Sequence, residues 1–117
     1  MILSIVNPNA THAMTESVAQ TACMVAAPGT RIDARTNTSG PLSIEGSVDG
    51  AMAVPGMLEL MRAAEAEGAD AQVIACFDDT GLDAARSLLS APVIGIGEAG
   101  ARAVSYTHLR AHETKAN

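Results

Sequence analysis

The sequence predicts an α/β protein with a parallel sheet of about four strands and helices on both faces. The first observation behind this prediction is that short strand-like segments, bounded by turn residues, alternate along the chain with longer segments of helical spacing. The second is composition: 117 residues, 48 % hydrophobic and 2 % aromatic, are enough for one domain with an aliphatic core. The same composition argues against disorder.

Four segments are predicted to be strands: Ile2–Val6, Arg31–Thr36, Gln72–Ala75 extended by Cys76 and Phe77, and Pro92–Ile96. The first strand stops at Asn7-Pro8-Asn9, because proline cannot continue the hydrogen bonding of a strand. Ligands of parallel sheets bind at the carboxyl ends of the strands. At that edge the sequence places Asn7-Pro8-Asn9, the loop from Asn37 to Glu45, Cys76 to Thr80, and Gly97-Glu98.

The segments between the strands have helical spacing. A helix is predicted from Thr11 to Ala27, where Thr11 and Thr15 offer capping hydroxyls and Pro28-Gly29 ends the helix. Its expected buried stripe consists of Met14, Val18, Ala22 and Val25.

Proline interrupts the next helical segment. Pro55-Gly56 lies inside Val48 to Glu67, which predicts two helices, the second from Met57 to Glu67. A further helix is expected from about Asp79 to Leu89, and another begins at Gly97.

Charge and cysteine content exclude several classes. Thirteen acidic against seven basic residues give a net charge of −6 with no run of Lys or Arg, which argues against a nucleic-acid partner. The apolar start, Met1 to Val6, is too short for a membrane span and lacks the basic residues of a signal peptide. Two cysteines, Cys23 and Cys76, make neither a disulfide framework nor an ordinary zinc site. We therefore expect a cytoplasmic protein with no metal and no membrane partner.

The segment from Val104 to Asn117 departs from the preceding pattern. It holds the single Tyr, the single Lys and two of the three His residues. The string resembles a translated sequencing-library adapter, so we interpret residues 1–103 as the native α/β domain and residues 104–117 as a non-native tail. The alternative is a polar C-terminal tail that belongs to the protein.

Cys76 is the first candidate for chemistry. It follows a predicted buried strand and precedes a helix, whose free N–H groups and positive end favour a thiolate that acts as a base or nucleophile. Asp78 and Asp79 oppose that effect, and the alternative is a small buried core residue. Cys23 lies in the middle of a helix, away from the strand ends, and is interpreted as a packing residue.

Each of the other polar and glycine-rich segments has two possible interpretations. Asn7 and Asn9 either donate amides to a substrate carbonyl or cap the first helix, and the loop around Ser43 either lines a site or only turns the chain. His12 is either an acid–base group or a surface residue. The run Gly95 to Gly100 matches G-x-G-x-x-G, but it follows the fourth strand, which favours close helix–strand packing over a dinucleotide site.

Four segments together resemble the aspartate/glutamate/hydantoin racemase superfamily, most closely its hydantoin and allantoin racemase branch. The similarity extends from Ile2 to about Ala103 and lies in Ile5-Val6-Asn7-Pro8-Asn9, Gly40-Pro41-Leu42-Ser43-Ile44-Glu45-Gly46, Val73-Ile74-Ala75-Cys76-Phe77-Asp78-Asp79-Thr80-Gly81-Leu82 and Pro92-Val93-Ile94-Gly95-Ile96. The family's first loop usually continues with Thr-Ser. Here Ala10 and Thr11 stand in those places, which removes one hydroxyl near the expected site.

The resemblance implies a cofactor-independent racemase that acts on a 5-substituted hydantoin or a related small molecule. In such enzymes two cysteines face opposite sides of a carbon next to a carbonyl, and Cys76 matches the first of them. The resemblance assigns Asn7, Asn9 and Ser43 to the ring or carboxylate of the substrate. Phe77, Asp78, Asp79 and Thr80 are expected to offer backbone N–H groups to the developing enolate.

The family's second cysteine belongs to a second, pseudo-symmetric α/β lobe, which has no counterpart in this sequence. We therefore expect an N-terminal fragment that is nearly inactive alone and homo-oligomeric when full length. Two alternatives remain: a non-catalytic α/β ligand-binding module, and a dinucleotide-binding oxidoreductase that uses the Gly95–Gly100 loop.

Overall fold

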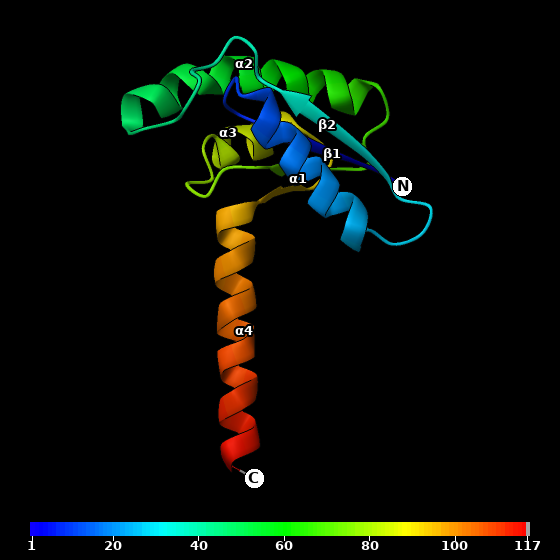
Figure 1. Cartoon of the computed structure of the whole chain (residues 1–117), viewed down its shortest axis with the longest axis vertical. Helices are drawn as coiled ribbons and strands as arrows, with labels where there is room; N and C mark the ends of the chain where they lie inside the picture. The colour runs from blue at the N-terminus through cyan, green and yellow to red at the C-terminus, as the bar shows by residue number, and fades with distance from the viewer. Residues whose placement is uncertain (117) are drawn as a thin grey trace.

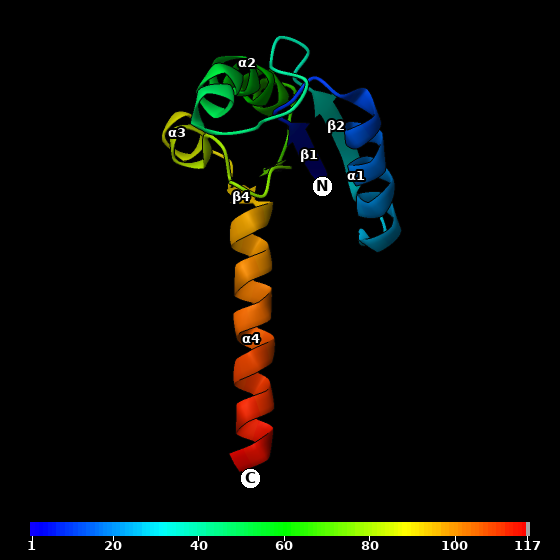
Figure 2. The same cartoon turned by 60° about the vertical axis from the view of Figure 1, so that its left-hand side comes forward.

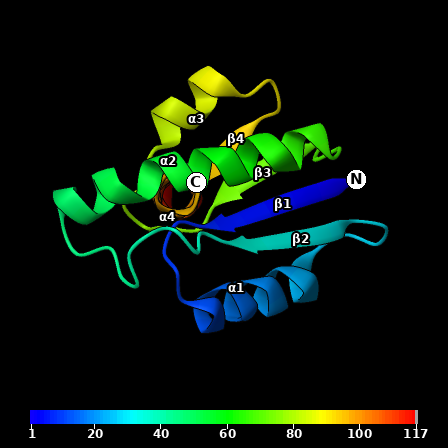
Figure 3. The same ribbon diagram turned by 90° about the horizontal axis from the view of Figure 1, so that it is seen from above.

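A computed structural model describes residues 1–116 of the chain, with side chains through residue 107. Four strands form one parallel sheet in the order β2-β1-β3-β4, which confirms the α/β fold class (Figures 1 and 3). In chain order the elements are β1 (Ile2–Asn7), α1 (His12–Val25), β2 (Arg31–Thr36), α2 (Ser47–Ala66), β3 (Ala71–Ile74), α3 (Leu82–Leu88), β4 (Val93–Gly95) and α4 (Ile96–Ala116).

The parallel register brings the carboxyl ends of the strands to one edge. Asn7 pairs with Thr36 of β2, and Ile74 of β3 pairs with Val6 on one side and Gly95 on the other. The loops that follow these strands therefore begin side by side, as the sequence predicts.

The core lies between the sheet and the helices α2 and α3, which cover the same face (Figure 3). It consists of Val6, Met57, Met61, Ile74, Leu82, Ala85, Leu89 and Val93. Burial of each large aliphatic side chain stabilises the fold by about 1.5–3 kcal/mol. Gln72 is buried in this layer and donates its amide to the carbonyl of Met61 at 2.7 Å.

The opposite face is covered less completely. Helix α1 packs there, but Thr15 is its only buried residue, whereas Met14 and Val25 of the predicted stripe are 49 % and 80 % exposed. Helix α4 leads away from the sheet (Figures 1 and 2), and Ile94 on β4 remains 43 % exposed. The prediction that the stripe of α1 is buried is therefore wrong for these residues.

Helix α2 is continuous through Pro55, so the prediction of two helices is wrong. The missing N–H of proline leaves the carbonyl of Ala51 without its helical partner. Both residues are exposed, so water can satisfy that carbonyl. Ala53 and Met57, on either side of the proline, are both fully buried, and a continuous helix keeps them on one face.

Strand β3 is shorter than predicted, because it ends at Ile74 and leaves Cys76 in a loop. The following helix starts at Leu82 rather than at Asp79. Asp79 has φ 50° and Gly81 has φ 71°, and a helix cannot contain these left-handed conformations.

Helix α4 passes through the boundary between Ala103 and Val104 without a break. The interpretation of residues 104–117 as a non-native tail stays a prediction. Asn117 and the side chains from residue 108 onward lie outside the described part of the chain. No helix in the described part is long and apolar enough to span a membrane.

Candidate functional site

A pocket of about 340 Å³ lies at the carboxyl edge of the sheet. Its walls come from the loops after β1, β2 and β3 and from the beginnings of α1 and α4. It is lined by Pro8, Asn9, Met14, Val18, Ser43, Ile44, Ala75, Cys76, Phe77, Asp78 and Ile96. The pocket thus brings together five of the predicted site residues, and Asn7, Asp79 and Thr80 are outside its walls.

Cys76 lies two residues beyond the end of β3 and is partly exposed. Its Sγ atom is 3.3 Å from Oγ1 of Thr80, and its carbonyl accepts the N–H of Asp79 at 3.0 Å. One side of the residue packs against the core. The thiol therefore belongs to a tight turn whose other side is open to the pocket. Cys23 is exposed on α1 and does not line the pocket.

The two asparagines at the carboxyl end of β1, Asn7 and Asn9, have different surroundings. Asn7 is 2 % exposed, and its amide donates to Oδ1 of Asn9, the carbonyl of Thr11 and Oγ1 of Thr15. These bonds build the loop and occupy the donors of Asn7. The amide nitrogen of Asn9 reaches only the weakly accepting sulfur of Met14, at 3.4 Å, so it is the donor better placed to serve a ligand.

Capping of α1 differs from the prediction. Thr11 is the N-cap residue, but no side chain caps the helix there. The hydroxyl of Thr11 donates instead to the carbonyl of Leu42 at 2.7 Å, and the hydroxyl of Thr15 lies 2.7 Å from that of Thr36. These hydroxyls connect α1 to β2 and its loop, which fixes one wall of the pocket.

Asn37 is the main structural residue of the site that the sequence did not single out. Its amide is buried and donates to the carbonyls of Pro8 and Ala53, each at 2.9 Å. Its backbone N–H donates to the carbonyl of Asn7 at 3.0 Å. One side chain thus joins the loop after β1, the loop after β2 and helix α2. The sequence feature that could have identified Asn37 was its position directly after the predicted strand Arg31–Thr36.

Ser43, Phe77 and Asp78 form the exposed rim of the pocket. Phe77 is 84 % exposed, and Ser43 donates only to Glu45 Oε1, at 3.4 Å. The backbone N–H groups of Phe77 and Asp78 have no partner within the part of the chain that the structure describes. These two groups are therefore free to bind an acceptor outside the described chain, and their expected role toward an enolate stays a prediction.

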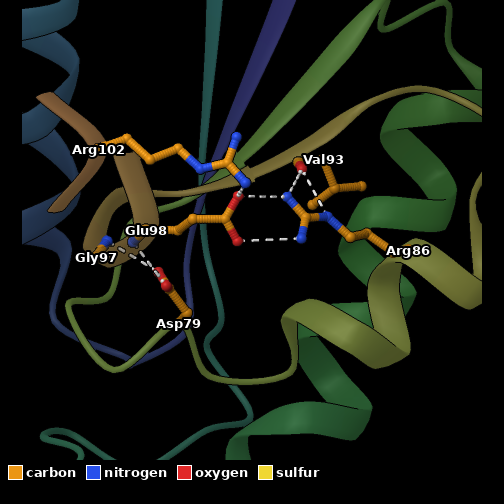
Figure 4. A network of polar contacts seen from close by, with 6 residues as sticks. All are labelled: Asp79, Arg86, Val93, Gly97, Glu98 and Arg102. Atoms are coloured by element: carbon orange, nitrogen blue, oxygen red, sulfur yellow. Dashed lines mark hydrogen bonds and ion pairs between the residues drawn. The ribbon is translucent and has the colours of Figure 1, made fainter. Parts of the chain in front are cut away.

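Asp79 does not line the pocket, and its carboxylate points toward the first turn of α4 (Figure 4). Its carboxylate accepts the N–H groups of Gly97 and Glu98 at 2.9 and 2.8 Å. Glu98 also binds Arg86, which in turn donates to the carbonyl of Val93. The hydrogen bonds from Arg86 lower the pKa of Glu98 below its ordinary value, although desolvation opposes the shift.

Two glycines of the Gly95–Gly100 run, Gly95 and Gly97, leave room for this contact. A Cβ at Gly95 would lie 2.2 Å from Oδ1 of Asp79, and one at Gly97 would lie 2.2 Å from the carbonyl of Phe77. A Cβ at Gly100 would meet nothing within 4 Å. The lack of side chains at Gly95 and Gly97 therefore leaves room for the loop after β3. The sequence favours a different reason for these glycines, namely close packing between a helix and a strand.

A second hollow, of about 950 Å³, lies between α2 and α3. It shares no lining residue with the pocket at Cys76 and contains no residue from the strand ends. We therefore take the smaller pocket as the candidate site. Within the described residues, no group of three His, Cys, Asp or Glu side chains is arranged to hold a metal ion.

Fold and pocket together define a class: a parallel α/β lobe with a single thiol at the carboxyl edge of its sheet. Within this class, the Asp/Glu/Hydantoin racemase family model matches residues 3–111, and the chain belongs to this family.

Individual relatives agree with this assignment. The chain is 50 % identical over 99 residues to a hydantoin racemase of Rhizobium meliloti and 46 % identical over 107 residues to one of Paenarthrobacter aurescens. It resembles the structures of an allantoin racemase from Klebsiella pneumoniae (TM-score 0.82, 49 % identity) and of one from Pseudomonas fluorescens (TM-score 0.86, 32 % identity). These matches cover 85–91 % of this chain but only 40–45 % of each relative.

Proposed function

We propose that residues 1–103 are the N-terminal lobe of a cofactor-independent racemase that moves a proton at the carbon next to a carbonyl of a 5-substituted hydantoin or a related cyclic ureide. The observation that carries the proposal is the position of Cys76, whose thiol borders a pocket that also offers free N–H donors. The family assignment supports the reaction class.

The chemistry requires a base and a stabilised anion. As a thiolate, Cys76 removes the proton from the carbon, and the electron pair of the broken C–H bond moves onto the neighbouring carbonyl oxygen as an enolate. In the proposed mechanism the N–H groups of Phe77 and Asp78, which have no partner within the described part of the chain, donate to that oxygen. One such donor contributes about 3 kcal/mol of transition-state stabilisation.

Inversion requires a proton on the opposite face of the carbon. In this proposal a second thiol, from another lobe, donates that proton and becomes a thiolate. The lobe described here holds only Cys76 at its pocket. We therefore propose that the isolated chain is nearly inactive. We also propose that the complete protein is a homo-oligomer of two-lobed subunits in the cytoplasm.

The pocket walls suit a small, partly apolar molecule. A volume of about 340 Å³ is at the lower end of the range of small-molecule sites. Met14, Val18, Ile44 and Ile96 offer an apolar surface to the 5-substituent, whereas Asn9 and Ser43 are the polar groups nearest to a ring carbonyl or N–H.

The dinucleotide alternative is less compatible with this geometry. A phosphate at the N-terminus of α4 needs the N–H groups of Gly97 and Glu98. Asp79 already occupies both, and its negative charge repels a phosphate. The alternative interpretation of the pocket at Cys76 is a non-catalytic ligand-binding module.

Competition for alkylation tests the site in this chain. An enantiopure 5-substituted hydantoin is expected to slow the alkylation of Cys76 by iodoacetamide, as measured by mass spectrometry. Cys23, exposed on α1, is the control within the same molecule and should react at an unchanged rate. Equal rates at Cys76 with and without the hydantoin would contradict the proposed substrate class.

Catalysis is tested in the complete two-lobed protein. We expect it to abolish the optical rotation of an enantiopure hydantoin and the Cys76→Ala variant to lose this activity, whereas Cys23→Ala keeps it. Retained activity in Cys76→Ala would contradict the proposal. Binding without loss of optical rotation would favour the non-catalytic module.

A further inference from the structure

Asp79 links the loop that carries Cys76 to the first turn of α4. Both of its carboxylate oxygens accept backbone N–H groups, one from Gly97 and one from Glu98 (Figure 4). These N–H groups belong to the first turn of a helix, where backbone donors have no partner inside the helix. A carboxylate at this end also interacts favourably with the positive end of the helix dipole.

The surrounding backbone is shaped for this contact. Asp79 has φ 50°, a left-handed conformation that Asp and Asn tolerate better than most residues. On the other side of the contact, any side chain at Gly95 would collide with Oδ1 of Asp79. Two unusual local features, 16 positions apart in the sequence, therefore serve one pair of hydrogen bonds.

The same residue fixes the turn that holds the thiol. The N–H of Asp79 donates to the carbonyl of Cys76 at 3.0 Å, and the next residue, Thr80, places its hydroxyl 3.3 Å from Sγ. Movement of Asp79 would therefore change both contacts of Cys76.

We propose that Asp79 is a positioning residue, which anchors the Cys76 loop to the N-terminus of α4 and so holds the thiol at the pocket. Its importance for catalysis rests on the function proposed above. This role differs from the expected one, because the backbone N–H of Asp79, which the sequence assigns to the developing enolate, donates to the carbonyl of Cys76 instead.

Two substitutions separate the carboxylate from the backbone conformation. Asp79→Gly keeps the left-handed conformation but removes the hydrogen bonds, whereas Asp79→Asn keeps the conformation and one acceptor. Both are made in the whole chain with Cys23→Ala, so that Cys76 is the only thiol. Amide hydrogen exchange at Gly97 and Glu98 is followed by NMR, and the alkylation rate of Cys76 is measured under the same conditions.

Asp79→Gly is expected to accelerate exchange at both amides and alkylation of Cys76 by about tenfold, while the exchange of core amides such as that of Ile74 stays unchanged. Asp79→Asn is expected to restore both rates to within about threefold of the parent chain. Unchanged amide exchange in Asp79→Gly would overturn the anchor. Faster exchange with unchanged alkylation would overturn the positioning role and leave Asp79 as a helix cap only.

Gly95→Ala tests the anchor from the opposite side and does not depend on the folding of the Asp79 variants. Its methyl group displaces the carboxylate, so it should reproduce the effects of Asp79→Gly, and it should add little when combined with Asp79→Gly. Gly100→Ala, in open space on α4, is the control and should accelerate neither amide exchange nor alkylation. Additive effects of Gly95→Ala and Asp79→Gly would contradict the proposed contact.

The amide-exchange test of the Asp79 anchor does not depend on the hydantoin-protection test of the proposed function. If hydantoin fails to protect Cys76, the proposed substrate class fails, but amide exchange still reports on the anchor. If the anchor fails, hydantoin protection and the activity of the complete protein still test the function.

Discussion

The two faces of the sheet differ in how completely the chain covers them. Under α2 and α3, Met57, Met61 and Ile74 have no exposed surface. On the side of α1, Met14 and Ile94 are 49 % and 43 % exposed, and α4 leads away from the sheet (Figure 2). One face therefore stabilises the fold, whereas the other supplies the apolar wall of the pocket.

The largest effect should come from a substitution in the core of the closed face, which is the face of the sheet under α2 and α3. Ile74→Ala removes a fully buried side chain of β3 and should lower the free energy of unfolding by about 2–5 kcal/mol, measured by urea denaturation. Ile94→Ala on β4 is the matched control, because its side chain is 43 % exposed, and it should cost less than about 1 kcal/mol. Equal losses would mean that the two faces contribute equally.

A smaller effect is expected at the connection between the closed face and the pocket. Asn37→Ala leaves the carbonyls of Pro8 and Ala53 without their side-chain donor and should destabilise the chain by about 1–3 kcal/mol. Asn9→Ala, on the pocket wall, removes the acceptor of the Asn7 amide and of the Thr11 N–H, so it should also destabilise the chain. Only Asn9→Ala should in addition reduce the protection of Cys76 by hydantoin. Urea denaturation and alkylation together distinguish the two asparagines, and equal protection of Cys76 in the two variants would contradict this division.

The sequence predicts the closed face better than the pocket, for a physical reason. Strand positions and the spacing of Met57 and Met61 follow from local periodicity. The same periodicity assigns Met14 and Val18 to the core, although the structure places both on the pocket wall. Periodicity identifies an apolar side of a helix but not which surface that side faces.

Contacts between distant loops were even harder to predict from the sequence. The position of Cys76 at the strand edge was predictable, because strand, cysteine and turn residues follow one another in the sequence. The contact of Asp79 with Gly97 and Glu98 depends on a left-handed residue and on the spatial order of two strands. Asn37 likewise joins three segments that only the folded chain brings together.

The ion pair of Arg86 and Glu98 predicts a modest pH dependence. Because Arg86 lowers the pKa of Glu98 in the folded chain, the pair stabilises the fold above the ordinary pKa of a glutamate and loses this contribution as the pH falls through the lowered value. Stability should therefore fall as the pH drops below the ordinary pKa of a glutamate, and the Glu98→Gln variant should show a smaller fall. Thermal unfolding across this range measures the difference. Identical pH profiles would show that the pair does not contribute.

The smallest effect is expected from removal of residues 104–117. The side chains of Val104 and Tyr106 are 71 % and 61 % exposed, and α4 leaves the sheet before it reaches them (Figure 1). A chain that ends at Ala103 keeps Glu98 and Arg102, so the first turn of α4 and its contact with Asp79 remain. We expect its free energy of unfolding to change by less than about 0.5 kcal/mol and the alkylation rate of Cys76 to stay the same. A larger change in either would assign residues 104–117 to the fold and contradict their interpretation as a non-native tail.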